Sequence, residues 1–329
     1  MNITFNSFPI FIRKWVIPLL LSQCIFQAGI AENYPTRPIK INIPSPPGGG
    51  TDTLARILAD KLKDRLGQPI LIENRAGAGG NIAGEATFKA PPDGYTLMLA
   101  HPAPLVINKY LYQKLSYDPD LFSPIILVAT VPNVLVVNSN GRFNSVQQLI
   151  ASAKSNPDKF NYASGVIGSP SSLTPELFKF LTSTKITGIP FQGSSPAIVA
   201  LLSGEVDLMF VELSTALPHI KSGKLKALAI ANDKRSSFLA DTPTLAETLP
   251  GFSAAVWFAI VGPPKLPVSI SETLTNTLND ILHLPEVSKQ ISELTMESVG
   301  GSQSELSNYL KEESKRWSSV IKMGGFRVD

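Results

Sequence analysis

The stretch Pro-Ser-Pro-Pro-Gly-Gly-Gly-Thr-Asp-Thr-Leu-Ala-Arg at residues 44–56 follows a short apolar segment at 39–43. Leucine and isoleucine then recur with helical spacing, so the stretch predicts a turn between a strand and an amphipathic helix. Three glycines leave the backbone open to close approach, and Thr51 or Asp52 is expected to cap the helix. The free N–H groups of such a helix N-terminus suit an anion such as a carboxylate. On these residues alone, a plain tight turn and an anion site are equally supported.

Residues 1–31 have the composition of a secretory signal peptide. They contain no acidic residue, carry Arg13 and Lys14, and continue with an apolar run that is too short and interrupted to span a bilayer comfortably. Gly29 and Ala31 are small residues at the −3 and −1 positions of a cleavage site. We therefore expect export to the periplasm and cleavage, with a retained membrane anchor as the alternative.

Cys24 is the only cysteine and lies in this segment, so the mature chain is expected to lack disulfides and thiol chemistry. Gln23 directly before it is a poor match to the small residue of a lipoprotein signal. Removing Arg13 and Lys14 from the 29 basic residues leaves 27 against 26 acidic ones, a net charge of +1. No cluster of basic residues with interleaved aromatic ones occurs, which argues against nucleic-acid binding.

The rest of the chain alternates strand and helix patterns, as is typical of sheets covered by helices on both faces. Strands are expected at 39–43, 69–72, 95–100, 125–137, 160–164, 186–191, 206–211, 225–231 and 254–261. The expected helices include 146–155, 173–181, 196–202, 215–220, 268–282, 285–294 and 302–323. Gly67 is expected to end the first helix, and Ser302 with Glu305 forms a capping box for the last one.

Two similar α/β units predict a hinged protein of two lobes with its ligand in the cleft between them. The β-rich stretches 125–137, which Pro132 interrupts, and 254–261 are expected to cross between the lobes. We assign 1–31 to the signal peptide, 32–131 and 253–329 to lobe 1, and 132–252 to lobe 2.

Four segments share one design, in which small residues follow a strand and open a helix. They are 46–52, 101–105, 168–173 and 192–197. Ligands of doubly wound sheets bind at the carboxyl ends of strands, where such loops lie. One helix N-terminus contributes only about 0.3–1 kcal/mol toward an anion, so several must converge. Two loops from each lobe therefore predict a site that holds an anion from both sides.

The signatures of enzymes are incomplete. Segment 47–53 lacks the Gly-Lys-Ser/Thr end of a phosphate-binding loop, and Ile82 stands where a dinucleotide fingerprint needs its third glycine. No Gly-x-Ser-x-Gly elbow occurs. His101, His219 and His283 lie far apart without the pairing of a metal site, so we expect no metal, cofactor or catalytic residue. His101, at a strand end, is kept as a ligand contact.

Two acidic residues and one tryptophan lie where a ligand can meet them. Asp52 either caps its helix or faces a ligand amine, and capping is the expected role. Glu212 follows a buried strand and either contacts the ligand or faces the solvent rim. Trp257 either forms a wall of the cleft or belongs to the core.

A set of motifs in fixed order covers essentially all of the mature chain. The motifs are Tyr34-Pro-x-Arg37-Pro38, Pro46-Pro-Gly-Gly-Gly-Thr-Asp52, Glu73-Asn-Arg-x-Gly-Ala-Gly-Gly-Asn81, Pro92-Asp-Gly-Tyr95, Val128-Ala-Thr-Val-Pro-Asn-Val-Leu-Val136, Gly193-Ser194, Ala216-Leu-Pro-His-Ile-Lys-Ser-Gly-Lys224-Leu, Thr242-Pro-Thr244 and Val299-Gly-Gly301. Together they resemble the substrate-binding proteins of tripartite tricarboxylate transporters, the Bug (TctC-like) family of bacterial periplasmic receptors.

The resemblance implies a type II periplasmic-binding-protein fold, with two α/β lobes and two crossover strands. Its lobes would close on a dicarboxylate, tricarboxylate, amino acid or related acid, held by backbone N–H groups and water. It also implies a soluble receptor, expected to be monomeric, that performs no chemistry and delivers its ligand to a membrane permease. The alternatives are a ligand-sensing partner of a periplasmic sensor kinase and an enzyme that processes carboxylates on the same fold.

The chain departs from the family pattern in the predicted pocket. Ser45 replaces a usual aromatic residue, Ser172 a frequent histidine, and Gln192 a common lysine, while Val211-Glu212 stands where Asp-Asn is common. We hypothesise that these changes favour a ligand carrying an amine or amide. The predicted ligand-binding residues are Ser45, Gly48, Gly49, Gly50, Thr51, Asp52, His101, Ser169, Ser171, Ser172, Gly193, Ser194, Ser195, Glu212 and Trp257.

Overall fold

The structure is a computed structural model that describes residues 34–165 and 169–328. The expected signal peptide and its cleavage site lie outside the described residues, as does Gly168 of the third predicted loop. Among the helices described, none is both long and apolar enough to span a membrane.

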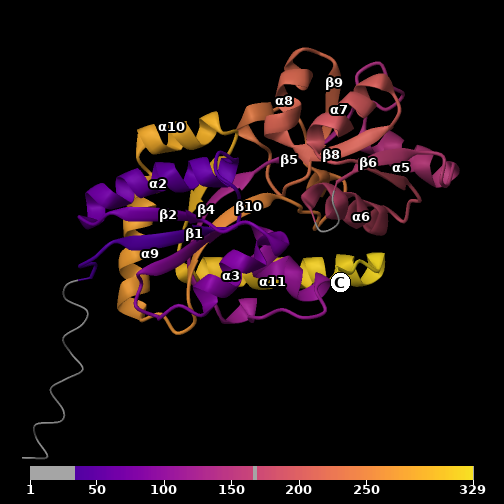
Figure 1. Cartoon of the computed structure of the whole chain (residues 1–329). Helices are drawn as coiled ribbons and strands as arrows, with labels where there is room; N and C mark the ends of the chain where they lie inside the picture. Colours follow the sequence, from indigo (N-terminus) through magenta and orange to yellow (C-terminus); the bar gives the residue numbers. More distant parts are fainter. Residues whose placement is uncertain (1–33, 166–168, 329) are drawn as a thin grey trace, which may run out of the picture.

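Two lobes are built on two separate sheets (Figure 1). The first sheet has the order β11-β4-β10-β3-β1-β2, and the second has the order β7-β6-β8-β5-β9. The strands of the first are β1 (Ile39–Ile43), β2 (Ile70–Asn74), β3 (Thr96–Ala100), β4 (Ser123–Val131), β10 (Val256–Gly262) and β11 (Glu297–Gly300). Those of the second are β5 (Asn133–Asn138), β6 (Asn161–Ser164), β7 (Thr187–Pro190), β8 (Leu208–Glu212) and β9 (Leu225–Ile230).

Both sheets mix parallel and antiparallel pairs. β1 lies parallel to β2 and β3, as the strand–helix alternation predicts, and β6 lies parallel to β7 and β8. The crossing strands form antiparallel pairs: β10 with β3 and β4, and β5 with β8 and β9. At the edge of the first sheet, β11 is also antiparallel to β4. Pro132 divides the predicted stretch 125–137 into β4 and β5, because proline has no N–H for a sheet ladder. The chain thus leaves the first sheet at Pro132 and returns to it as β10.

Helices cover both faces of each sheet, as expected. The α-helices are α2 (Gly50–Leu66), α3 (Asn81–Phe88), α4 (Asn108–Leu111), α5 (Val146–Ser155), α6 (Pro170–Thr182), α7 (Ser194–Ser203), α8 (Leu213–Lys221), α9 (Val268–Leu282), α10 (Pro285–Glu293) and α11 (Gln303–Gly324). Short 3₁₀ turns are η2 (Ala78–Gly80), η4 (Pro119–Leu121), η5 (Ser237–Leu239) and η6 (Leu245–Glu247), and η3 (Ala103–Ile107) is a π-helix. Gly67 ends α2 in the left-handed conformation, and the predicted capping box opens α11.

The predicted cap of α2 is wrong. The helix begins at Gly50, its N-cap residue is Gly49, and no side chain caps it. Asp52 lies inside the first turn, where its carboxylate still accepts the N–H of Gly48 at 3.0 Å. The side chain therefore closes the loop that precedes the helix.

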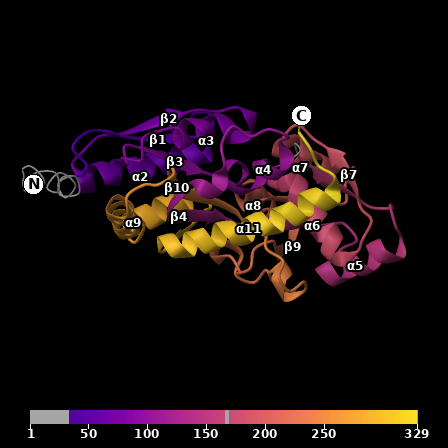
Figure 2. The same ribbon diagram turned by 90° about the horizontal axis from the view of Figure 1, so that it is seen from below.

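The C-terminal helix α11 connects the two lobes. It runs beneath both of them (Figure 2) and contacts β4 and η3 in the first lobe and α6 in the second. Its Trp317 belongs to a buried cluster that continues from Met98 in the first sheet to Phe210 in the second. The two lobes therefore share one hydrophobic core on this side of the molecule.

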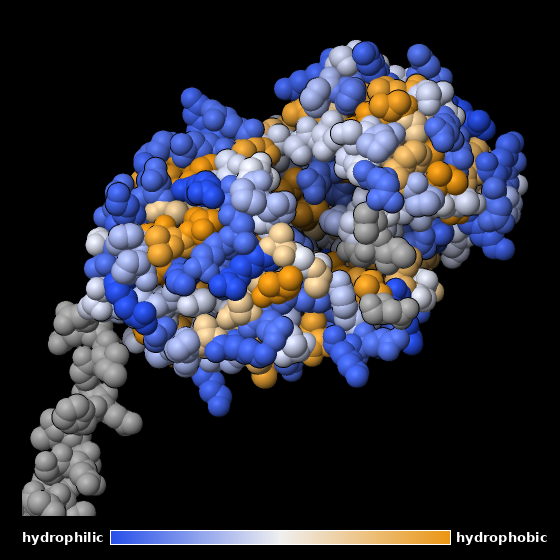
Figure 3. All heavy atoms as spheres, in the orientation of Figure 1, coloured by the Kyte–Doolittle hydropathy of each residue, from blue (hydrophilic) through white to orange (hydrophobic). Residues whose placement is uncertain are grey.

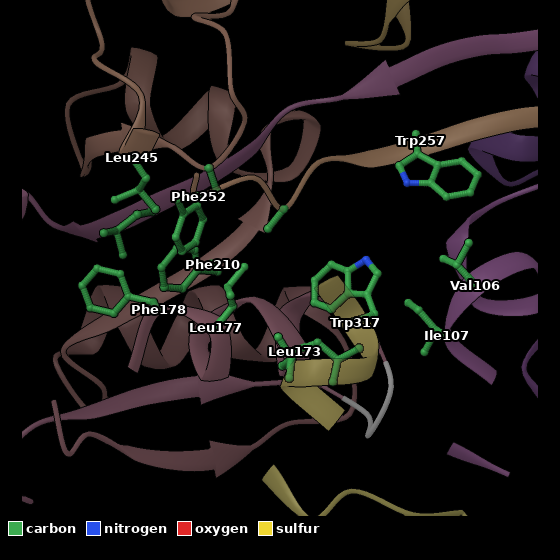
Figure 4. Close-up of a cluster of buried hydrophobic side chains, with 14 of the residues drawn as sticks. Val106, Ile107, Leu173, Leu177, Phe178, Phe210, Leu245, Phe252, Trp257 and Trp317 are labelled. Carbon is green, nitrogen blue, oxygen red and sulfur yellow. The ribbon is translucent and has the colours of Figure 1, made fainter. Parts of the chain in front are cut away.

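Trp257 lies in this shared core, with Trp317 beside it (Figure 4). Its side chain is 0% exposed, and both indole N–H groups donate to Oε2 of the buried Glu313, at 2.9 and 3.0 Å. Arg316 also pairs with Glu313. Of the two interpretations of Trp257 in the sequence, the structure supports the core.

Candidate functional site between the lobes

A cavity of about 490 Å³ opens between the two lobes, where Figure 3 shows a hollow. The first lobe lines it from several loops at the ends of β1, β2 and β3, and the second lobe lines it with Ser169, Pro170 and Glu212. A smaller cavity of about 240 Å³ adjoins it inside the second lobe and shares these three residues. We call the larger one the interlobe cavity and the smaller one the inner cavity.

The loop between β1 and α2 forms one wall of the interlobe cavity. Pro44, Pro46 and Thr51 line the cavity, whereas Asp52 does not. The Asp52 carboxylate accepts hydrogen bonds from the guanidinium of Arg56, the N–H of Gly48 and the amide of Asn74. The Arg56 hydrogen bonds, followed by that from Gly48, lower the Asp52 pKa to about 2. The carboxylate thus holds the loop in place rather than facing a ligand.

His101 lines the interlobe cavity at the end of β3. Burial lowers its pKa to about 4, so the ring is neutral at physiological pH. Its Nδ1 accepts the N–H of Ala103 at 3.3 Å, which places the ring proton on Nε2. His101 can therefore donate one neutral hydrogen bond to a ligand.

The second lobe directs two helix N-termini at the inner cavity. Ser169, Pro170 and Ser171 at the start of α6 line it, as do Gly193 and Ser194 at the start of α7. No side chain caps either helix within the described part of the chain. The first N–H groups of α7 thus remain available for an acceptor on a ligand, whereas at α6 Pro170 has no N–H and the Ser172 N–H donates to the Ser169 carbonyl, which leaves that of Ser171.

Glu212 ends β8 at the point where the two cavities meet. Glu212 itself is exposed, and the protein atoms that surround its carboxyl partly desolvate it, which raises the Glu212 pKa above the usual range. Asn133 lies directly opposite in the register of β5 and β8 and lines the inner cavity. Sequence reasoning missed Asn133, although an amide directly after Pro132 in a run of valines and leucines is an unusual choice for a buried strand.

The structure brings seven of the fifteen predicted residues to the two cavities. They are Thr51, His101, Ser169, Ser171, Gly193, Ser194 and Glu212. The others do not line either cavity: Ser45, Gly48, Gly49, Gly50, Asp52, Ser172, Ser195 and Trp257.

Local contacts explain several of these absences. The Ser45 carbonyl accepts the amide of Asn74, and the Ser172 hydroxyl donates to the Ser169 carbonyl at 2.9 Å. A Cβ on Gly50 would lie 3.1 Å from the Met296 side chain, so this glycine serves the packing of α2. Three glycines therefore shape the loop without themselves lining the cavity.

Charge is scarce in the lining. No lysine or arginine of the described chain lines either cavity, and Glu212 is the one acidic residue that does. No group of metal-ligating side chains was found among the described residues. The polar groups of the lining are helix N–H groups, serine hydroxyls, one neutral imidazole and the polar ends of β5 and β8, and they lie among apolar side chains such as Ile107 and Phe258.

Two α/β lobes around these adjoining cavities define a solute-binding protein of the two-lobed class. The family model described as "Tripartite tricarboxylate transporter family receptor" matches residues 54–326. The chain belongs to this receptor family.

Relatives and solved structures extend over most of the chain. Protein BugT of Bordetella pertussis is 38% identical over 302 residues, which cover 91% of this chain and 92% of BugT. The R. palustris protein Rpa4515 with adipate has a TM-score of 0.73 and 35% identity, covering 89% of this chain and 99% of the other. MatC from Rhodopseudomonas palustris with bound malate has a TM-score of 0.69 and 32% identity, covering 88% of this chain and 100% of MatC. The expected fold of a periplasmic binding protein is confirmed.

Proposed function

We propose that this receptor binds a small organic carboxylate between its lobes and delivers it to the membrane permease of its transporter. The observation that carries the proposal is the convergence of α2, α6 and α7, whose uncapped N-terminal turns contribute residues to the two adjoining cavities. Several helix N-termini stabilise an anion without any basic side chain. The structures with adipate and malate are of proteins similar over nearly the whole chain.

We further infer that the mature protein acts in the periplasm after removal of residues 1–31. Residues 32–131 with 253–329 would form one lobe and 132–252 the other, hinged at the crossing strands. The membership of the strands in the two sheets supports this division, since β5 to β9 form the second sheet. Ligand release to a permease needs no bond to be made or broken, so no catalytic residue is assigned.

A binding assay with two variants of one residue tests the role of the helix N-termini. Ser194→Pro removes the first N–H group of α7 at a position where proline fits a helix, and the ψ of 171° at Gly193 lies outside the helical range that a following proline disfavours. Ser194→Ala removes the hydroxyl and keeps the N–H group. A hydrogen bond to a charged group contributes about 1.5–3 kcal/mol, so the proline variant should bind roughly 10- to 150-fold more weakly than the alanine variant.

The ligand is first found by thermal shift of the purified mature protein with a panel of carboxylates and neutral sugars. A carboxylate at 100 times its Kd should add about 2.7 kcal/mol of stability. Isothermal titration then gives the affinities of the two variants. Stabilisation by sugars and by no carboxylate would contradict the proposed function, and equal affinities of the two variants would contradict the role of α7.

A further inference from the structure

A groove of about 650 Å³ runs along α11, apart from the two cavities already described. One wall is α11 itself, and the other comes from η3, α4 and η4 of the first lobe; α11 contacts η3 and α4 directly (Figure 2). Buried Leu105 and Phe122 contribute to the lining, so the floor of the groove is apolar. None of its residues lines the interlobe cavity or the inner cavity, so the proposed carboxylate site gives this groove no role. We call it the α11 groove.

Lysines dominate the charge of the α11 groove. Lys311, Lys315 and Lys322 extend from α11, and Asp120 is the one acidic residue of the lining within the described chain. Asp120 is already paired, because Nζ of Lys109 lies 2.6 and 2.7 Å from its two carboxylate oxygens. The three lysines of α11 are exposed, and their ammonium groups have no ion pair or hydrogen bond to the part of the protein that the structure describes. The groove therefore carries three uncompensated positive charges.

These three lysines share one face of α11. Their positions, 311, 315 and 322, lie within about 40° of each other around a helix of 3.6 residues per turn. Lys311 and Lys315 are one turn apart, and like charges at that spacing destabilise a helix. The lysine face thus contributes nothing to folding, and an anion bound along it would relieve the repulsion.

The shape of the groove restricts its occupant. A rise of 1.5 Å per residue puts Lys322 about 16 Å beyond Lys311 along the helix, so a single phosphate or a small carboxylate cannot meet both. About five residues of extended polypeptide span this distance, with alternate side chains on the same side. A flat membrane surface would meet the exposed lysines but not the apolar floor at Leu105 and Phe122.

We propose that the α11 groove docks an extended acidic segment of a partner protein. Carboxylates of the segment pair with Lys311, Lys315 and Lys322, and its apolar side chains contact the floor. Charge complementarity supports this choice: the expected mature chain has a net charge of only +1, so three unpaired lysines on one face leave the rest slightly acidic. Such an asymmetry directs an acidic partner to this face.

The same helix also contacts α6 of the second lobe. A partner docked in the α11 groove therefore holds an element that connects the two lobes, without entering the cavities between and inside them.

Fluorescence anisotropy of a labelled acidic dodecapeptide of glutamate, alanine and leucine, titrated with the mature protein at low salt, tests the docking. Lys311→Gln/Lys315→Gln should weaken binding about fivefold, because each exposed charge pair changes an equilibrium roughly 1.5- to 5-fold. Lys221→Gln/Lys224→Gln removes the same charge from exposed positions of the second lobe and should change binding less than twofold. The same peptide with glutamine in place of glutamate should bind more weakly than either variant binds the acidic one.

Hydrogen exchange locates the bound peptide. Exchange in α11 should slow when the acidic peptide is present, whereas protection confined to the starts of α6 and α7 would place the peptide in the inner cavity and overturn the proposal. Equal weakening by the two lysine pairs, or no binding of the acidic peptide, would also overturn it. Phosphatidylglycerol vesicles that bind the wild type but not Lys311→Gln/Lys315→Gln, with no binding of the peptide, would assign this face to a membrane instead.

Discussion

His101 should make the stability of the protein depend on pH between 8 and 5. Its native pKa is about 4, whereas an unfolded histidine has a pKa near 6.5. The unfolded chain therefore binds the extra proton first as the pH falls, so the native state loses stability in that direction. The contribution is fully present above pH 6.5 and is lost as the pH falls toward 4.

The size of the effect follows from the difference between the two pKa values. At about 1.36 kcal/mol per unit, a shift of roughly 2.5 units gives about 3.4 kcal/mol as the limit below pH 4. At pH 5 the same pair of values gives about 2 kcal/mol relative to pH 8. Asp52 and Glu247 keep their native pKa values near 2, so they stay ionised in the folded protein over this range.

Urea unfolding of the mature protein at pH 8 and pH 5 measures this contribution. His101→Gln lacks the titrating ring, so the variant should lose about 2 kcal/mol less than the wild type between the two pH values. His219→Gln, which removes an imidazole outside both cavities, controls for the loss of any histidine. Equal losses in the wild type and His101→Gln would refute the assignment of a neutral His101 with a lowered pKa.

Three further predictions concern stability. Glu313→Ala leaves two buried indole N–H groups and Arg316 without their acceptor, so urea unfolding should show a loss of about 3–5 kcal/mol. Gly80→Ala should cost about 1–3 kcal/mol in the same assay, because φ is +94° and the new Cβ would lie 2.9 Å from Pro44 Cβ. Asp52→Asn keeps the shape but replaces charged hydrogen bonds with neutral ones, which should cost about 1 kcal/mol at pH 7.

Each of these variants has a check of its own. Glu312→Ala removes the exposed neighbour of Glu313 and should change the unfolding free energy little, and a similar loss in both would contradict the buried network. Asp60→Asn is the control for Asp52→Asn, because it removes an exposed carboxylate of α2 and should change the unfolding free energy little. An equal loss in both variants would contradict the role of the Asp52 hydrogen bonds. A Gly80→Ala protein as stable as the wild type would show that η2 can relax away from Pro44.

Much of the fold was predictable because its signals are local. Gly67, Pro132 and the Ser302–Glu305 capping box each act through backbone geometry within a few residues, and each acts as predicted. β11 was missed because its four residues, Glu297–Gly300, have too little apolar pattern, and pairing with β4 alone defines the strand. The cap of α2 was wrong because the short side chain of Asp52 reaches Gly48 from inside the helix.

The site was predictable only in part, because a loop fixes where a cavity lies but not which atoms face it. All four predicted loops contribute lining residues, yet eight of the fifteen residues named turn elsewhere. Trp257 is the clearest case. β10 is buried along its whole length, so alternation along the strand cannot distinguish cavity from core. The position of the Trp257 side chain depends on its hydrogen bond to Glu313 of α11, a residue far along the chain.

Asn133 and Glu212 show what the sequence would have needed to reveal the site's polarity. Each residue alone has an ordinary explanation: an amide after a proline, and an acid at the end of a strand. Only the antiparallel register of β5 and β8 places them opposite each other, and only the direction of β8 puts both beside the starts of α6 and α7. Helix N-termini favour a negative group nearby, whereas the Glu212 carboxylate disfavours one. The charge balance of the lining therefore depends on strand register, which no single segment of the sequence encodes.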